Sequence, residues 1–357
     1  MAPRILFVVP YPLKHAPSQR FRVELYEQYM VAAGFSYTIE PFMDKSTWDI
    51  LYKGGSTFQK IAGTIRGFLK RASVCLFTVR HYDYVFIHRE ASPVGPPFFE
   101  WIISKLHRKK VIYDFDDAIW IPNTSQENRF AGWLKAFWKV KYICKWSYKV
   151  AAGNRYLSRY ASQFNDRVIL LPTNVDILNG HNRLKEHSDG EVVIGWTGSH
   201  STLHYLDALV PVLSRLSHQY RFRFLVIADK DPQLSLDNYE FIRWNETTEI
   251  DDLLRMDIGI MPLHTDAWSE GKCGFKLIQY LALGIPAVAS PVGVNKEIIK
   301  EGENGFLAST PEDWYRYLSL LISEFEARSV MGANGRKTVV NRYSIQAHRQ
   351  QFLDLFS

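Results

Sequence analysis

The stretch from Gly271 to Asn295 reads GKCGFKLIQYLALGIPAVASPVGVN, and it decides the fold. Its first apolar run predicts a buried helix, and Gly284 to Pro286 predict a turn after that helix. The second apolar run predicts a buried strand. Two lysines, Lys272 and Lys276, stand at the front of the helix. A lysine there opposes the helix dipole unless an anion compensates its charge. The stretch therefore predicts a helix start that holds an anion.

Outward from this stretch, short β-branched runs alternate with longer amphipathic segments, which predicts parallel sheets with helices on both faces. A polar segment, Ile177 to Glu191, interrupts the alternation, so we expect two doubly wound α/β domains joined by a linker. The expected helices include one capped by Ser18 and ended by Gly34, and one from about Thr202 to Gln219. The expected strands are Arg4–Pro10, Tyr82–His88, Lys109–Asp117, Arg167–Asp176, Val192–Ser199, Arg221–Asp229, Asp257–Leu263 and Ile285–Pro291.

The composition is that of a globular protein. The chain has 357 residues, enough for two domains, with 46% hydrophobic and 22% charged residues. Its net charge of +6 favours an anionic partner. Three cysteines without metal or redox spacing fit a reducing compartment. No apolar run reaches membrane-spanning length, so we expect a cytoplasmic protein unless it lies on a membrane surface.

Two groups of polar residues follow expected strands in the second half. Gly198, Ser199 and Thr202 form a small-residue turn in which backbone N–H groups can approach a phosphate, although an ordinary strand-to-helix turn has the same appearance. Lys276 and Gln279 lie three residues apart and therefore on one helix face. We expect Lys276 to neutralise a diphosphate and Gln279 to bind a ribose.

These motifs have a counterpart in a known family. KCGFKLIQYLALGIPAVASPVG followed by NGFLA, with DIGIMPL before it and MGANGRKTVVNRYS after it, resembles the donor-binding segment of retaining GT-B glycosyltransferases of family 4 (group 1). The resemblance is close in the second half and looser in the first. It implies an α/β GT-B fold, with two Rossmann-like doubly wound domains facing across a cleft. The implied boundaries are 1–175 for an acceptor-binding domain and 176–339 for a nucleotide-sugar-binding domain, with a helix at about 340–357 packing back on the first.

The resemblance also implies a function. Such an enzyme moves a sugar from a nucleotide-diphosphate sugar to an acceptor hydroxyl with retention, needs no cofactor or metal, and serves cell-surface polysaccharide or glycolipid synthesis. Two enzymatic or binding alternatives stay open at this point: a nucleotide-sugar epimerase of the same fold, and an inactive sugar-nucleotide or glycan-binding protein.

The sequence departs from the family at the donor signature, which has two glutamates with seven residues between them. The second falls on Gln279, and the first falls on Gly271, one residue after Glu270. The family's Arg and Lys pair after the first strand of the donor domain is missing, so we expect Lys272 and Lys276 to carry more of the diphosphate charge. The resemblance places further donor contacts at Gly274, Phe275 and the segment Phe241–Glu246, where Trp244 either stacks on the base or belongs to the core.

In the first half, VIYDFDDAIW carries the main candidates. Asp116 takes the place of a histidine that the family often has, and Asp117 follows it. We expect one of the two to bind the acceptor and accept its proton; alternatively, Asp114 and Asp117 cap the next helix. DFDD also contains the Asp-x-Asp pattern of metal-dependent GT-A enzymes, but it lies in the acceptor half, so we expect no metal. The acceptor-binding candidates are Ser18, Gln19, Arg20, His88 and Glu90.

The segment Trp133 to Val150 is rich in lysines and aromatic residues. As one helix, it would gather five lysines on one side, with three aromatic rings among them. This arrangement suits an anionic membrane surface and a lipid-linked glycan acceptor, although a solvated helix face is the plainer alternative. We expect no nucleic acid, because no nucleic-acid-binding module accompanies the segment. The residues are Lys135, Lys139, Lys141, Lys145 and Lys149, with Trp138, Tyr142 and Trp146.

Overall fold

A computed structural model describes residues 3–51, 55–122 and 135–357 of the chain. The chain divides into two compact units. Unit 1 comprises Met1–Thr173 and Arg349–Ser357, and unit 2 comprises Asn174–His348. Within the described ranges, no helix is long and apolar enough to cross a membrane.

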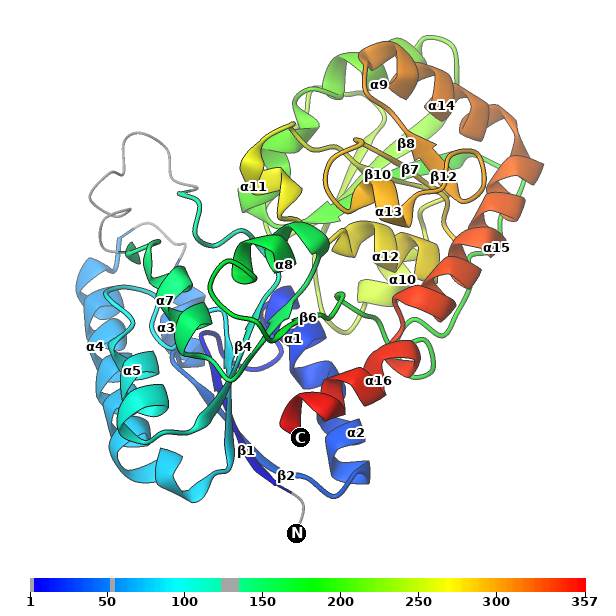
Figure 1. Cartoon of the computed structure of the whole chain (residues 1–357). Coiled ribbons are helices and arrows are strands. Elements are labelled where there is room, and N and C mark those ends of the chain that lie inside the picture. The colour runs from blue at the N-terminus through cyan, green and yellow to red at the C-terminus, as the bar shows by residue number, and fades with distance from the viewer. Residues whose placement is uncertain (1–2, 52–54, 123–134) are drawn as a thin grey trace. The chain divides into compact units, whose positions relative to one another are not determined.

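Unit 1 contains a six-stranded parallel sheet in the order β2-β1-β3-β4-β5-β6, flanked by helices (Figure 1). Its first strand is completely buried from Ile5 to Val9, as expected for a parallel strand covered on both faces. The strands are β1 (Arg4–Val9), β2 (Ser36–Pro41), β3 (Tyr84–His88), β4 (Lys110–Phe115), β5 (Lys149–Ala152) and β6 (Val168–Leu170). The helices are α1 (Pro17–Arg22), α2 (Glu27–Ala32), α3 (Lys45–Leu51), α4 (Thr57–Ser73), α5 (Phe98–Trp101), α7 (Lys139–Trp146) and α8 (Arg155–Ala161).

The end of the chain belongs to unit 1. Helix α16 (Ile345–Leu353) leads into a last helical turn, and its Phe352 ring stacks on Tyr26 with 3.8 Å between the ring centroids. Phe352 and Phe356 are both buried, so this segment completes the core beside β1 and β3.

Unit 2 contains a second six-stranded parallel sheet, in the order β12-β11-β10-β7-β8-β9. Its core joins the apolar residues of this sheet to those of α9 and α14. The strands are β7 (Val192–Gly198), β8 (Phe222–Ala228), β9 (Tyr239–Arg243), β10 (Ile258–Met261), β11 (Ala287–Ala289) and β12 (Gly305–Leu307). The helices are α9 (Val210–Ser217), α10 (Glu249–Leu253), α11 (Ala267–Glu270), α12 (Phe275–Ala282), α13 (Asn295–Ile298), α14 (Pro311–Ser323) and α15 (Phe325–Arg342), with a 3-10 helix η6 (His200–Leu206).

The predicted fold class of two doubly wound parallel α/β units is confirmed. In each sheet the chain reverses its direction of winding once, between β1 and β3 in unit 1 and between β7 and β10 in unit 2. Ligands of open α/β sheets bind outside the carboxyl ends of the strands at such a switch point. The two points therefore locate one candidate site in each unit.

Two predicted helices differ from the structure. The helix after β1 is broken into α1, a 3-10 turn and α2, and its N-cap is Ala16 instead of Ser18. The predicted helix Thr202–Gln219 is η6 followed by α9. Proline at position 211 favours a new helix start there, because its fixed φ suits the first turn of a helix. It also has no N–H with which to continue the hydrogen bonds of the preceding helix.

Candidate active site

The donor candidates of unit 2 gather around the start of α12. Its N-cap residue is Gly274, with φ +68°, a left-handed conformation that favours glycine. A Cβ there would also lie 2.3 Å from Cδ1 of Ile298, so a side chain would displace α13. The close approach fixes where the first turn of α12 presents its backbone N–H groups.

Lys276 reaches from this first turn to the end of β7. Its Nζ lies 5.3 Å from the ring centroid of Trp196, a residue that is only 1% exposed. Lys272 lies over Trp268 of α11, with Nζ 5.0 Å from the ring centroid. Both contacts are within cation–π range. Two cations therefore lie at the start of one helix, with Lys276 at the switch point of the sheet.

A hydrogen bond joins α12 to β7. The hydroxyl of Tyr280 accepts from the backbone N–H of Thr197 at 3.0 Å. Burial raises the pKa of Tyr280, so the hydroxyl stays neutral at physiological pH. The adjoining turn is ordered by its own side chains, because Thr202 donates to the Ser199 carbonyl at 3.0 Å and the hydroxyls of Ser199 and Ser201 lie 2.8 Å apart. The predicted small-residue turn follows β7, which ends at Gly198, two residues after the Trp196 ring over which Lys276 lies.

Gln279 does not face an open space. It is 2% exposed, and its amide donates to Oε1 of Glu249 at 3.2 Å. Trp244 donates its indole N–H to the same oxygen, also at 3.2 Å. Glu249 was missed from the sequence, because it lies 30 residues away in an acidic helix start that reads as an ordinary dipole-compensating turn.

Glu270 ends α11, next to the glycine that takes the place of the family's first glutamate. A Cβ on Gly293 would lie 2.8 Å from the Glu270 carbonyl oxygen, so the loop after β11 passes directly against this residue. Asp266 caps α11 by accepting from the Ser269 N–H at 2.7 Å. The end of α11 at Glu270, and Lys272 two residues later, are thereby held next to the start of α12.

In unit 1, a chain of side chains runs inward from Ser18. The Ser18 hydroxyl lies 2.9 Å from Nε2 of His88, and Nδ1 of His88 lies 2.7 Å from Oδ2 of Asp114. In the neutral imidazole, Nδ1 donates to the carboxylate and Nε2 accepts from the hydroxyl. Asp114 also pairs with Arg22, which donates onward to the Leu171 carbonyl. His88, Asp114 and Arg22 are at most 1% exposed, so the alternative in which Asp114 caps the next helix is wrong.

Arg89 joins the two remaining carboxylates. Its Nε donates to Asp116 at 2.9 Å, and its Nη2 donates to Asp117. Burial alone would raise the pKa of Asp116, but the charge of the paired Arg89 outweighs it and holds that pKa below its usual range. The same two carboxylates raise the pKa of Arg89 against the effect of burial. Arg89 has a positive φ of 60°, and its carbonyl accepts from the Tyr113 hydroxyl at 2.8 Å.

The other acceptor candidates are placed differently. Gln19 is completely buried, and its amide is bonded to the Tyr11 N–H and to Glu24. Arg20 lies over the ring of its neighbour Phe21 at 5.2 Å. Glu90 pairs with Lys139 at 2.7 Å. Ser18 of α1 and His88 at the end of β3, by contrast, contact each other. The spacing of these residues in the sequence does not show which of them come into contact.

The lysine-rich segment is not one helix. Helix α7 ends at Trp146, and Lys149 begins β5, where its ammonium donates to the carbonyls of Asp354 and Ser357. Lys139 is 3% exposed and pairs with Glu90. The prediction of five lysines on one helix side is therefore wrong; Trp133 and Leu134 lie outside the described residues.

The Asp-x-Asp pattern has no metal-binding geometry. Asp114 is engaged by Arg22 and His88, and Asp116 by Arg89. Across the ranges that the structure describes, no group of three or more His, Cys, Asp or Glu residues is arranged to hold a metal ion.

Comparison with known proteins agrees with this geometry. Residues 208–338 match the family "Glycosyl transferases group 1". An uncharacterized glycosyltransferase of Methanocaldococcus jannaschii is 25% identical over 213 residues, which cover 53% of this chain and 59% of that protein. The chain thus matches about three fifths of the relative's length.

Solved structures show the same architecture over the full chain. Sucrose-phosphate synthase from Thermosynechococcus elongatus has a TM-score of 0.72 at 14% identity, covering 100% of this chain and 98% of its own. HepE from Anabaena, in complex with UDP and glucose, has a TM-score of 0.69 at 15% identity, covering 99% and 98%. The chain has the two-domain α/β fold of GT-B glycosyltransferases, and its residues 208–338 are similar to the group 1 glycosyl transferases.

Proposed function

We propose that this protein transfers a glycosyl group from a nucleotide-diphosphate sugar to an acceptor hydroxyl. The observation that supports it most is the position of Lys276. The residue lies in the first turn of α12, over Trp196 of β7, at the switch point of the sheet. A cation at a helix N-terminus is unfavourable by itself, and a bound diphosphate would compensate it.

In this proposal the diphosphate lies between the turn after β7 and the start of α12. Lys276 and Lys272 supply the charge, while backbone N–H groups at Ser199 and Gly274 supply directional donors. Glu249, which holds Gln279 and Trp244, is the carboxylate available near the ribose and base. HepE was solved with UDP, so we propose a uridine diphosphate sugar as the first donor to test.

We propose that unit 1 binds the acceptor at Ser18, with Asp116 and Asp117 beside it. An arginine-paired carboxylate with a lowered pKa is a good hydrogen-bond acceptor and a weak base. Asp116 therefore orients the acceptor hydroxyl, and the proton leaves with the departing diphosphate. This arrangement fits a retaining, metal-independent reaction in which positioning and diphosphate stabilisation supply the rate.

We further propose that the acceptor is a polysaccharide or lipid-linked glycan, and that the reaction takes place in the cytoplasm at the inner face of the membrane. The three cysteines are free and buried, which fits a reducing compartment. An anionic surface suits the net charge of +6.

A two-step experiment tests the proposal. Calorimetry with UDP, GDP, ADP and CDP identifies the base, and the matching sugar nucleotides are then incubated with glycan and lipid-linked acceptors, with and without a chelator. We expect binding of one diphosphate and acceptor-dependent transfer that survives chelation. Conversion of the donor sugar without any acceptor would instead indicate an epimerase, and binding without turnover would indicate a sugar-nucleotide-binding protein.

A further inference from the structure

Helix α4 has its faces reversed relative to an ordinary surface helix. Small residues face the domain: Gly63 and Gly67 are buried, and a Cβ on either would lie within 2.6 Å of Thr47 or Phe42. The large apolar residues face outward. A helix in a water-soluble protein normally buries that stripe.

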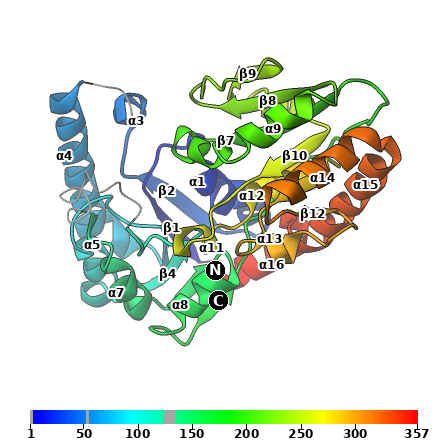
Figure 2. The ribbon, with the colours of Figure 1, turned by 90° about the horizontal axis from the view of Figure 1, so that it is seen from above.

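The outward stripe runs along the whole helix. Phe58, Ile61, Ile65 and Leu69 are spaced by three or four residues, which places them on one helix face. Their exposed fractions are 83%, 54%, 54% and 68%. Leu76, 53% exposed, lies in the π-helical segment Val74–Thr78 that follows α4. Figures 1 and 2 both show α4 at the edge of unit 1.

Charge selects the kind of partner. From Ile50 to Tyr82 the sequence contains six lysines and arginines and no aspartate or glutamate. Arg66 and Lys70 lie on the flank of the stripe, where they pair with Asp44 and Glu40. Both side chains of the Arg66–Asp44 pair are exposed, at 65% and 42%, so that pair contributes little. Lys70 is 47% exposed, so both cations can also reach another anion.

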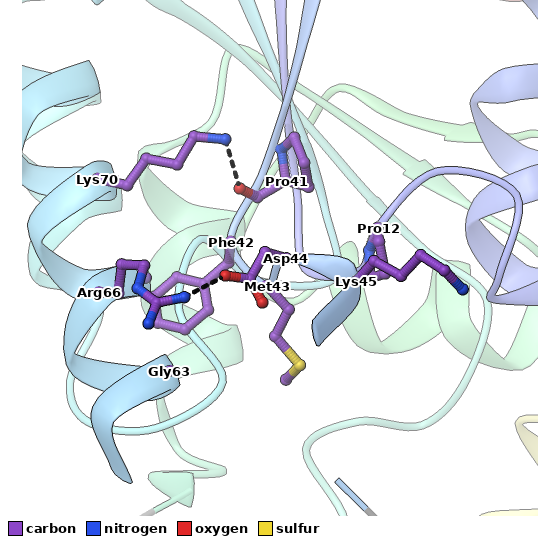
Figure 3. A pocket seen from close by; sticks show the side chains of 10 residues that line it. Pro12, Pro41, Phe42, Met43, Asp44, Lys45, Gly63, Arg66 and Lys70 are labelled. Atoms are coloured by element: carbon purple, nitrogen blue, oxygen red, sulfur yellow. Dashed lines mark hydrogen bonds and ion pairs between the residues drawn. The ribbon is translucent and has the colours of Figure 1, made fainter. Parts of the chain in front are cut away.

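A pocket of about 200 Å³ lies between the glycine side of α4 and the segment from Pro41 to Lys45 (Figure 3). Arg66 and Lys70 line it from α4, and Lys45 lines it from α3. Across the opening, Arg66 points to Asp44 and Lys70 donates to the Pro41 carbonyl at 3.2 Å. Arg66 and Lys70 each follow a residue of the stripe, Ile65 and Leu69, so their long side chains can reach from its edge toward lipid phosphates.

We propose that α4 is a membrane-docking helix, which inserts Phe58, Ile61, Ile65 and Leu69 into an anionic bilayer surface. Its flanking cations then lie at the level of the phosphates. The inference rests on the proposed location at the membrane and adds the part of the chain that is held there. It assigns docking to α4, in place of the segment around α7 that the sequence suggested.

Vesicle sedimentation with the full chain tests the proposal. Vesicles contain phosphatidylcholine alone or phosphatidylcholine and phosphatidylglycerol in equal parts. The variant Ile61→Ser/Ile65→Ser/Leu69→Ser should bind anionic vesicles roughly tenfold more weakly or worse, because three apolar side chains no longer leave water. Its fold should persist, since all three side chains are exposed, and circular dichroism checks this.

A matched control removes three exposed aliphatic side chains from unit 2. Leu178, Leu320 and Val330 are 62%, 39% and 61% exposed, and replacing all three by Ser should leave vesicle binding unchanged. A second measurement places the helix directly. The three native cysteines are buried, so an Ile65→Cys variant can be labelled selectively with an environment-sensitive fluorophore. Its emission should shift to the blue with anionic vesicles.

Each other outcome overturns the proposal. Absence of wild-type binding to anionic vesicles, or equal binding by the triple variant and the wild type, removes α4 from membrane docking. Sedimentation velocity could instead show that the wild type self-associates and the triple variant does not, while neither binds vesicles. That result would show that a second copy of the chain covers the stripe. Loss of transfer activity does not bear on these results, because vesicle binding is measured without donor or acceptor.

Discussion

His88 and Asp114 stand opposite each other in the register of β3 and β4, with Nδ1 of His88 2.7 Å from Oδ2 of Asp114. Both side chains are completely buried. Ser18 contacts the imidazole from one end, and Arg22 contacts the carboxylate from the other. The candidate acceptor site is therefore the outer end of a buried polar chain, and its stability and its chemistry depend on the same side chains.

Replacing Asp114 by Ala should strongly destabilise unit 1. The change leaves Arg22 buried without its carboxylate and His88 without its partner, and breaking a buried ion pair from one side costs about 3–5 kcal/mol. Urea unfolding measures the loss. Asp49→Ala is the matched control, because Asp49 pairs with Lys45 on an exposed helix face, where such a pair contributes about 0–1 kcal/mol. Equal effects of the two substitutions would show that the buried chain is not stabilising.

Replacing Lys276 by Ala should weaken binding of a nucleoside diphosphate by roughly 1.5–3 kcal/mol, the range for a charge-assisted hydrogen bond. Isothermal titration calorimetry measures this, and urea unfolding should show little change, since Lys276 is only partly buried. Lys300→Ala is the control, because this lysine is 53% exposed and pairs with Glu303. Unchanged affinity in the Lys276 variant would remove that residue from the donor site.

The sequence predicts both sheets because buried parallel strands are short, continuous apolar runs bounded by turns. Edge strands such as β2 and β9 were missed, since their residues are only partly buried and lack that signature. The pairing of His88 with Asp114 could not be predicted, because it depends on strand order and register. Lys149 was misassigned for a similar reason: its ammonium is held by the chain terminus, more than 200 residues away.

Asp116→Asn should lower turnover much more than donor affinity, because Asp116 lies in unit 1 beside Ser18 and His88. Only one of the two terminal atoms of the amide can accept a hydrogen bond from a hydroxyl group, whereas both carboxylate oxygens can. The amide also carries no charge to balance that of Arg89. Asp117→Asn should have the smaller effect, since Arg89 keeps its ion pair with Asp116 in that variant. Steady-state kinetics separates kcat from the donor KM. Full turnover in both variants would leave the two carboxylates with a structural role alone.

The lowered pKa of Asp116 also predicts how stability depends on pH. A carboxyl group whose folded-state pKa lies below its unfolded value of about 3.9 stabilises the fold above that value, and the contribution is lost as the pH falls towards the folded-state pKa. The difference in unfolding free energy between wild type and Asp116→Asn should therefore be constant near neutrality and shrink below about pH 4. Urea titrations at several pH values measure it. A difference that grows on acidification would contradict the direction of the shift.

Swapping the side chains of Gln279 and Glu249 tests whether Glu249 supplies the carboxylate that resembling proteins have at the position of Gln279. In Gln279→Glu alone, two carboxylates would meet where the Gln279 amide now lies 3.2 Å from Oε1 of Glu249, so one pKa must rise and the fold should lose about 1–3 kcal/mol. Adding Glu249→Gln restores one amide and one carboxylate with the roles reversed. The double variant should therefore recover most of the stability, and a double-mutant cycle in urea should give a coupling energy of about 0.5–3 kcal/mol.

If a carboxylate from either side serves the nucleotide, the double variant should also bind the diphosphate as the wild type does, whereas Glu249→Gln alone should bind it more weakly. Additive effects in the cycle would mean that the two side chains do not act as a pair. Glu249 would then not compensate for the carboxylate that Gln279 lacks.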